Sequence, residues 1–164
     1  MDKVKCLKKA NIYLGVIALI IIDQIVKVLI INNIKYKSVT IIKGILNFSY
    51  CENKGVAFSF GNGRVPLFIV INIIIIGGLI LYFEKNRSEF KGKLSKIFFT
   101  MVIAGGIGNL IDRIFRGFVV DFIDINQLFN FAIFNVADIY IVVGIIGLAI
   151  NFLIRGVQVT EKNR

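Results

Sequence analysis

The stretch that decides the fold is FNVADIYIVVGIIGLAINFLI, residues 134–154, an apolar run that carries Asn135 and Asp138 near its start. About 20 apolar residues are needed to cross the hydrocarbon core of a bilayer, so this stretch predicts a membrane-spanning helix. Ionisable groups are costly inside a membrane and by default indicate a functional site. Asn135 lies three residues before Asp138, which puts both side chains on one helical face within hydrogen-bonding reach.

Three further apolar runs predict three more spans. The hydrophobic fraction of 57% exceeds the roughly 45–50% of soluble chains, and the mean hydropathy is +0.81. The chain of 164 residues is short enough for a single domain, 1–164. We therefore expect a mainly α membrane protein with four transmembrane helices, over about 10–31, 65–83, 97–111 and 131–154.

Basic residues predict the orientation of these spans. The N-terminal tail, the 84–96 loop and the C-terminal tail together hold twelve Lys and Arg residues, against seven on the other side. Positive loops stay inside, so both termini are expected in the cytoplasm and the 33–64 loop outside. The net charge of +10 is distributed between apolar runs, which favours an anionic membrane surface as partner rather than nucleic acid.

The outer loop has a pattern of its own. ILNFSYC (45–51) and VAFSF (56–60) are rich in aromatic residues and predict short strands, and ENKG (52–55) between them predicts a turn. We expect a small extracytoplasmic β-strand platform on the outer surface of the membrane.

The residue inventory excludes several kinds of catalysis. The chain has no histidine, which removes Ser-His-Asp and Cys-His catalysis and HExxH zinc sites. Cys6 and Cys51 are too few and too far apart for a metal motif. No metal and no cofactor are expected.

Two of the acids within the spans have a structural interpretation. Asp23 and Lys27 are spaced i,i+4 and can neutralise each other on one helix. Asp112 can reach Arg116 in the same way. It also shares a helical face with small and polar residues that allow another helix to approach closely, namely Gly105, Gly108 and Asn109.

The other two acids suggest chemistry. Asp121 lies in an extended apolar segment, VVDFID (119–124), with Asp124 on the opposite side, and Asp138 lies just inside the fourth span. Two carboxyl groups brought together in a poorly solvated site share one proton. The ionised carboxylate can then activate water while the neutral one hydrogen-bonds a carbonyl group, which is aspartic-peptidase chemistry.

Spacing alone cannot bring Asp121 and Asp138 together, so two other classes remain open. A small transporter could use Asp23, Lys27, Asp112 and Asp138 as a proton relay. A non-enzymatic assembly subunit could use the glycine-rich third span as a packing face.

Five segments in order resemble one family. These are DQIVK (23–27), ENKGVAF (52–58), GGIGNLIDR (105–113), VVDFID (119–124) and FNVAD (134–138). Together they closely resemble bacterial lipoprotein signal peptidase, also called signal peptidase II. The resemblance covers nearly the whole chain and all four spans.

The resemblance implies an aspartic endopeptidase of the bacterial cytoplasmic membrane, with its active site near the outer face. Its substrates would be diacylglyceryl-modified prolipoproteins, cleaved just before the lipidated cysteine, and its inhibitor the cyclic peptide globomycin. Asp121 and Asp138 match the family's catalytic pair, and Asp23 and Lys27 match a structural motif of the first span. Residues matching positions that shape and support the site are Asn53, Gly55, Gly108, Asn109, Asp112, Arg113, Asn135 and Ala137. ENKGVAF, including Phe58, is expected to cover the site as a lid.

Overall fold

The computed structural model describes residues 2–55, 64–87, 89–90 and 92–162, with the backbone alone for 2–10 and 155–162. The elements in chain order are α1 (Asp2–Ile34), β1 (Val39–Ile42), β2 (Leu46–Asn53), α2 (Val65–Lys85), α3 (Lys93–Arg116), β3 (Val119–Asp124) and α4 (Val136–Lys162). Each helix contains a segment long and apolar enough to cross a membrane: Asn11–Ile34, Val65–Lys85, Lys93–Arg116 and Val136–Ile154. The expected fold, four spans with a small sheet, is confirmed.

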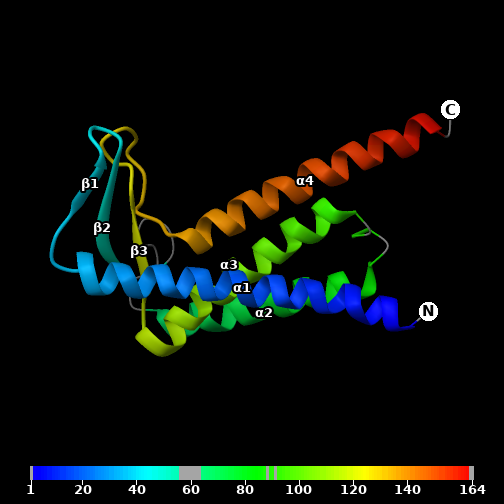
Figure 1. Ribbon diagram of the computed structural model, residues 1–164, viewed down its shortest axis with the longest axis horizontal. Coiled ribbons are helices and arrows are strands. Elements are labelled where there is room, and N and C mark those ends of the chain that lie inside the picture. The colour runs from blue at the N-terminus through cyan, green and yellow to red at the C-terminus, as the bar shows by residue number, and fades with distance from the viewer. Residues whose placement is uncertain (1, 56–63, 88, 91, 163–164) are drawn as a thin grey trace.

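Helix α3 lies at the centre of the bundle and packs against the other three helices (Figure 1). Its closest approach is to α4, where glycines remove the side chains that would separate the two backbones. A Cβ atom added to Gly144 would lie 2.6 Å from Val102 Cγ2 and 2.7 Å from the carbonyl oxygen of Phe98. The glycines of the fourth span therefore set the distance between α3 and α4.

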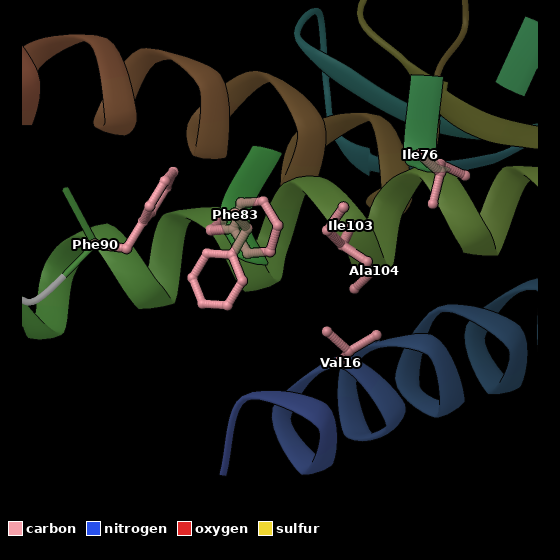
Figure 2. Packing of buried hydrophobic residues seen from close by; sticks show 7 residues of the cluster. Val16, Ile76, Phe83, Phe90, Ile103 and Ala104 are labelled. Atoms are coloured by element: carbon pink, nitrogen blue, oxygen red, sulfur yellow. The ribbon is translucent and has the colours of Figure 1, made fainter. Parts of the chain in front are cut away.

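Aromatic side chains fill the bundle at the end away from the sheet (Figure 2). The rings of Phe83 and Phe99 stack with centroids 4.5 Å apart, and Phe90 meets both edge-on. Phe83 lies in the last turn of α2 and Phe99 in the second turn of α3, so this cluster packs the two helices together on either side of their connection.

The sheet lies at the opposite end of the bundle (Figure 1) and has the antiparallel strand order β1-β2-β3. The strand predicted at 45–51 is confirmed as β2, which continues through Asn53 into the turn predicted at 52–55, and the extended segment 119–124 is confirmed as β3. β1 was not predicted, and it joins β2 through a tight turn at Gly44, whose φ is +77°. The second predicted strand, 56–60, lies outside the described residues.

Several helix boundaries differ from the sequence prediction; α1, for example, runs over Asp2–Ile34 rather than about 10–31. α4 begins at Val136 rather than near 131, because Phe134 pairs with Ile123 in a β-bridge and so continues the sheet. α3 runs over Lys93–Arg116 rather than 97–111. The last turn of α3 carries Arg113 and Arg116, and a helix C-terminus favours such cations. The helix is terminated by Gly117, whose φ is +77°.

Candidate active site

Asp121 is held on β3 by two amide side chains. Its Oδ1 accepts a hydrogen bond from Asn135 Nδ2 at 2.6 Å, and its Oδ2 accepts one from Asn53 Nδ2 at 2.9 Å. The antiparallel register brings the end of β2, which carries Asn53, alongside the start of β3. Asp121 is only 2% exposed, so these amides replace the water that the carboxyl group loses on burial.

Asp138 is held at the start of α4. Its Oδ2 accepts a hydrogen bond from the backbone N–H of Asn135 at 3.0 Å, while Asn135 Oδ1 accepts one from the backbone N–H of Asp138 at 3.0 Å. This reciprocal pair is a capping box, which satisfies two backbone donors at a helix N-terminus. Asp138 Oδ1 accepts a third hydrogen bond from Asn109 Nδ2 of α3, at 2.8 Å.

Asn135 joins the two carboxyl groups. Its side-chain nitrogen donates to Asp121 Oδ1 and also to Asn109 Oδ1, the latter at 3.2 Å. Its backbone N–H donates to Asp138. One fully buried asparagine therefore contacts both acids that the sequence singled out.

The two strand acids have opposite electrostatics. Burial, followed by the charge of Asp138, raises the pKa of Asp121 to about 6, against the opposing effect of the Asn53 and Asn135 hydrogen bonds. Burial alone would also raise the pKa of Asp124, but hydrogen bonds from Asn126 and Ser49 outweigh it and hold that pKa below its ordinary value. Of these two strand acids, Asp121 is the one that takes up a proton near pH 6.

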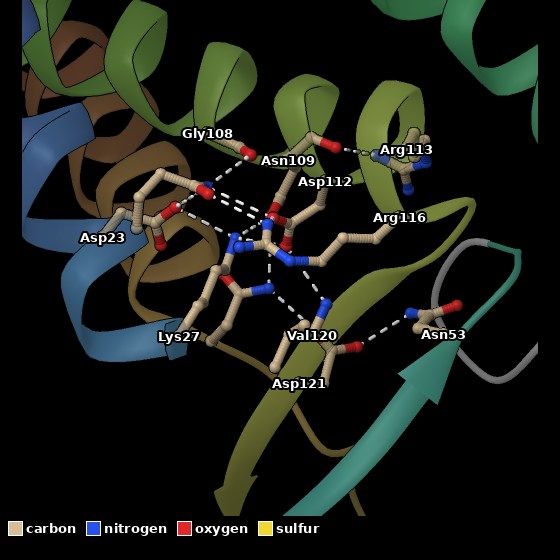
Figure 3. A network of polar contacts seen from close by, with 12 residues as sticks. Asp23, Lys27, Asn53, Gly108, Asn109, Asp112, Arg113, Arg116, Val120 and Asp121 are labelled. Atoms are coloured by element: carbon tan, nitrogen blue, oxygen red, sulfur yellow. Dashed lines mark hydrogen bonds and ion pairs between the residues drawn. The ribbon is translucent and has the colours of Figure 1, made fainter. Parts of the chain in front are cut away.

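A second polar network lies behind the acids and is centred on Lys27 (Figure 3). The buried Nζ of Lys27 lies 3.0 Å from Asp23 Oδ2 and 2.9 Å from Asp112 Oδ2, and it donates to Asn109 Oδ1 at 3.0 Å. Asn109 in turn holds Asp138. The predicted i,i+4 pair of Asp23 and Lys27 is therefore present. Lys27 also pairs with Asp112 on α3, a contact between two helices that the sequence did not indicate.

Asp112 connects the same network to the strand. Its Oδ2 accepts a hydrogen bond from the backbone N–H of Val120, at 3.1 Å, next to Asp121. Its Oδ1 pairs with Arg116, as the i,i+4 spacing predicts, and accepts from Gln24 Nε2 at 3.2 Å. Asp112 thus fixes the backbone that presents Asp121.

Arg113 points to the other side of α3, toward the end of β2. It donates to the carbonyl oxygen of Gly55 at 3.1 Å and, at 3.4 Å, to that of Asn109. Its guanidinium lies over the ring of Phe68, 5.9 Å from the centroid. Arg113 therefore ties α3 to both α2 and the segment after β2.

A cavity of about 540 Å³ opens beside the two acids. Asp121 and Asp138 lie in its wall with Asn53, Asn109 and Arg113. The rest of the wall is mostly apolar and comes from α2, α3, α4 and the segment before α4; it includes Asn72, Gly106, Phe131, Ile139, Val142 and Val143. The cavity combines a few convergent polar groups with apolar walls, as ligand sites do.

The remaining residues named from the sequence serve packing. A Cβ atom on Gly108 would lie 2.6 Å from Asp23 Oδ2, so a side chain there would displace the Lys27 network. A Cβ atom on Gly105 would collide with the carbonyl oxygen of Ala137, which makes these two residues the crossing point of α3 and α4. Phe58 of the expected lid lies outside the described residues.

Sequence reasoning missed two polar residues. Gln24 donates to Asp23 Oδ2 and to the carbonyl oxygen of Gly108, both at 3.2 Å, and accepts from Arg116 at 2.9 Å. Asn72 lines the cavity from α2. Asn72 is a lone amide within an apolar run and Gln24 lies beside Asp23 in the first span, and those positions were the available signals.

Four membrane-length helices with a polar cluster at the sheet end define a multi-span membrane protein with a cavity beside that cluster. The chain belongs to the signal peptidase II family, whose model, described as signal peptidase (SPase) II, matches residues 15–154.

Individual relatives agree with this assignment. The chain is 40% identical to the lipoprotein signal peptidase of Streptococcus pneumoniae over 147 residues, covering 89% of this chain and 94% of the relative. It is 38% identical to that of Fusobacterium nucleatum over 129 residues, covering 78% and 77%. A bacterial membrane enzyme solved by the in meso method at 2.3 Å resolution is 32% identical, with a TM-score of 0.79 and 88% of each chain covered.

Family membership decides among the three classes that the residues alone left open. A peptidase is an enzyme, so neither the transporter nor the non-enzymatic assembly subunit describes this chain.

Proposed function

We propose that Asp121 and Asp138 are the catalytic pair of an aspartic endopeptidase. As a member of the signal peptidase II family, the chain removes signal peptides from lipoprotein precursors. The observation that carries the aspartic assignment is the contact of Asn135 with both carboxyl groups, which holds them in the wall of one cavity.

The two acids divide the proton chemistry. Asp121, with its pKa raised to about 6, holds the shared proton and hydrogen-bonds the scissile carbonyl oxygen. Asp138 acts as the base and takes a proton from the water that attacks the carbonyl carbon. The water oxygen forms the new bond, the peptide C–N bond breaks, and a carboxyl proton passes to the leaving amine.

The cavity accommodates the substrate peptide. Its apolar wall from α2, α3 and α4 suits the hydrophobic part of a signal peptide. Asn53 and the Gly55 carbonyl held by Arg113 lie on the outer side, where the 52–58 segment acts as the lid. The acyl chains of a diacylglyceryl cysteine stay in lipid, each buried CH₂ contributing about 0.8 kcal/mol. Cleavage falls just before that cysteine.

The membrane orientation follows from the charge distribution. Both termini lie in the cytoplasm, and the sheet with the catalytic pair lies at the outer face of the bacterial cytoplasmic membrane. Globomycin, a cyclic peptide, binds in the cavity across the two acids. A reporter fused after Arg164 is active only on the cytoplasmic side if this orientation is correct.

The experiment that tests the proposed substrate compares two precursors of one sequence. Purified protein is incubated with the diacylglyceryl-modified precursor and with its unlipidated form, and release of the signal peptide is followed. Cleavage of the lipidated form alone, or strongly preferred, supports the proposal. Equal turnover of both forms contradicts recognition of the lipid, even if the aspartic chemistry survives.

A further inference from the structure

A second groove, of about 580 Å³, lies between α1 and α3 at the end of the bundle away from the sheet. Its lining shares no residue with the cavity beside Asp121 and Asp138. Most of the wall is apolar or small, from Ile12, Gly15, Ala18, Leu19, Ile97 and Met101. Three polar residues, Asn11, Lys93 and Lys96, complete one end of it, and Thr100 is the fourth polar residue of the wall.

The polar and apolar parts of this groove are ordered along the helices. Asn11 begins the membrane-length part of α1, and Lys93 begins α3. Leu19 and Met101 lie deeper on the same two helices, about 12 Å further in at about 1.5 Å per residue. One leaflet contributes about 15 Å of hydrocarbon, half of a core of about 30 Å. The groove therefore has a cationic mouth at the membrane boundary and an apolar floor within a single leaflet.

The charges at the mouth lack a counterion within the described part of the chain. Neither Lys93 nor Lys96 forms an ion pair with a described residue. Both stand in the first turn of α3, where no acid is present and where the N-cap residue, Gly92, makes no side-chain hydrogen bond to the helix. Cations next to the positive end of a helix repel it, and an anion placed there removes that repulsion.

We propose that this groove binds one anionic phospholipid. Its phosphate contacts Lys93 and Lys96 at the mouth, and one acyl chain runs along Ala18, Leu19 and Ile97 toward Met101. The head-to-tail order of the lipid matches the order of the groove. Because the site lies at the end of the bundle opposite the catalytic pair, its occupant is a bound membrane lipid and not the substrate.

Native mass spectrometry of the detergent-purified protein tests this proposal. Phosphatidylglycerol and phosphatidylcholine with identical acyl chains are titrated separately. Lysines near a membrane surface contribute about 1 kcal/mol each toward anionic lipid, so the two lysines predict at least a roughly tenfold preference for phosphatidylglycerol. Lys93→Gln/Lys96→Gln should abolish the preference. The charge-matched control Lys35→Gln/Lys37→Gln, at exposed positions beside the sheet, should keep it.

A second variant tests the groove itself. Ala18→Phe fills the groove without changing charge and should weaken the binding of both lipids, while cleavage of the precursor in detergent stays at the wild-type rate. Equal affinity for the two lipids, or an equal loss in the control pair, would overturn the proposal. Displacement of bound phosphatidylglycerol by millimolar inorganic phosphate as effectively as by free phosphatidylglycerol would also overturn it. The site would then recognise an anion without its acyl chain.

Discussion

Asn135 and Asp138 cap each other at the start of α4, each side chain accepting a hydrogen bond from the other's backbone N–H at 3.0 Å. The arrangement explains why a membrane span carries a carboxyl group. Asp138 occupies the first turn of the helix, at the rim of the span, where the backbone N–H of Asn135 and the side chain of Asn109 donate hydrogen bonds to it. The same asparagine reaches Asp121 on the strand, so the helix cap and the proposed catalytic pair are one unit.

Lys27 should be the most important buried cation for stability. In Lys27→Met the carboxylates of Asp23 and Asp112 lose the ammonium group between them, and breaking a buried ion pair costs about 3–5 kcal/mol. We expect a large fall in Tm in detergent, partly recovered in Asp23→Asn/Lys27→Met because one of the stranded charges is removed.

Arg87→Met is the matched control for Lys27→Met. Arg87 pairs with Glu84, but both side chains are substantially exposed, so the pair contributes at most about 1 kcal/mol. Its Tm should stay near wild type. Equal Tm values for Lys27→Met and Arg87→Met would refute the importance of the buried network.

The difference in stability between Asp121→Asn and the wild type should shift in favour of the variant as the pH rises. In the folded protein the pKa of Asp121 is raised from 3.8 to about 6, so the folded state binds the proton more tightly than the unfolded state. Ionising this carboxyl group therefore destabilises the wild type between about pH 4 and pH 6, by up to about 3 kcal/mol. The variant, which never ionises, should show a Tm difference that increases over this range.

Asp124→Asn should behave in the opposite way. Its folded pKa is lowered, so the ionised form stabilises the protein above the ordinary pKa and that stability is lost as the pH falls. The variant should be less stable than the wild type at pH 7 and approach it in acid. Tm differences that do not depend on pH in either variant would contradict the assigned electrostatics.

Gly144→Ala should destabilise the bundle more than Gly78→Ala. The new Cβ atom at position 144 meets Val102 and the carbonyl oxygen of Phe98, whereas a Cβ atom at position 78 meets nothing within 4 Å. Overpacking costs about 1–3 kcal/mol. Alanine at an open helical position gains about 1 kcal/mol over glycine. Thermal unfolding in detergent should rank Gly78→Ala first, wild type next and Gly144→Ala last. The reverse order would show that α3 and α4 do not pack as described.

The sequence predicted those features that depend on local pattern. Apolar runs predicted four spans, the 119–124 segment was expected to be extended, and i,i+4 spacing predicted the pairs of Asp23 with Lys27 and Asp112 with Arg116. Asn135 was expected to reach Asp138 because it lies three residues before it, and both of their mutual hydrogen bonds are present.

Features that depend on contacts between distant segments could not be predicted in the same way. β1 has no alternating pattern of its own and forms by pairing with β2. The start of α4 moves from about 131 to Val136 because Phe134 bonds to β3. Lys27 reaches Asp112 and Asn109 only because α1 crosses α3 at their level. Only the resemblance to a known family joined Asp121 to Asp138 in advance.

The measurement that tests the central claim most directly is cleavage of a diacylglyceryl-modified precursor by four purified proteins. Wild type and Asp124→Asn should release the signal peptide at similar rates, because Asp124 contacts Ser49 and Asn126 and does not line the cavity beside Asp121 and Asp138. Asp121→Asn and Asp138→Asn should be slower by at least roughly a thousandfold, since each keeps its shape but cannot exchange a proton. Each variant should remain folded by thermal unfolding. Wild-type turnover by a folded Asp138→Asn, or an Asp124→Asn as inactive as Asp121→Asn, would contradict the proposed catalytic pair.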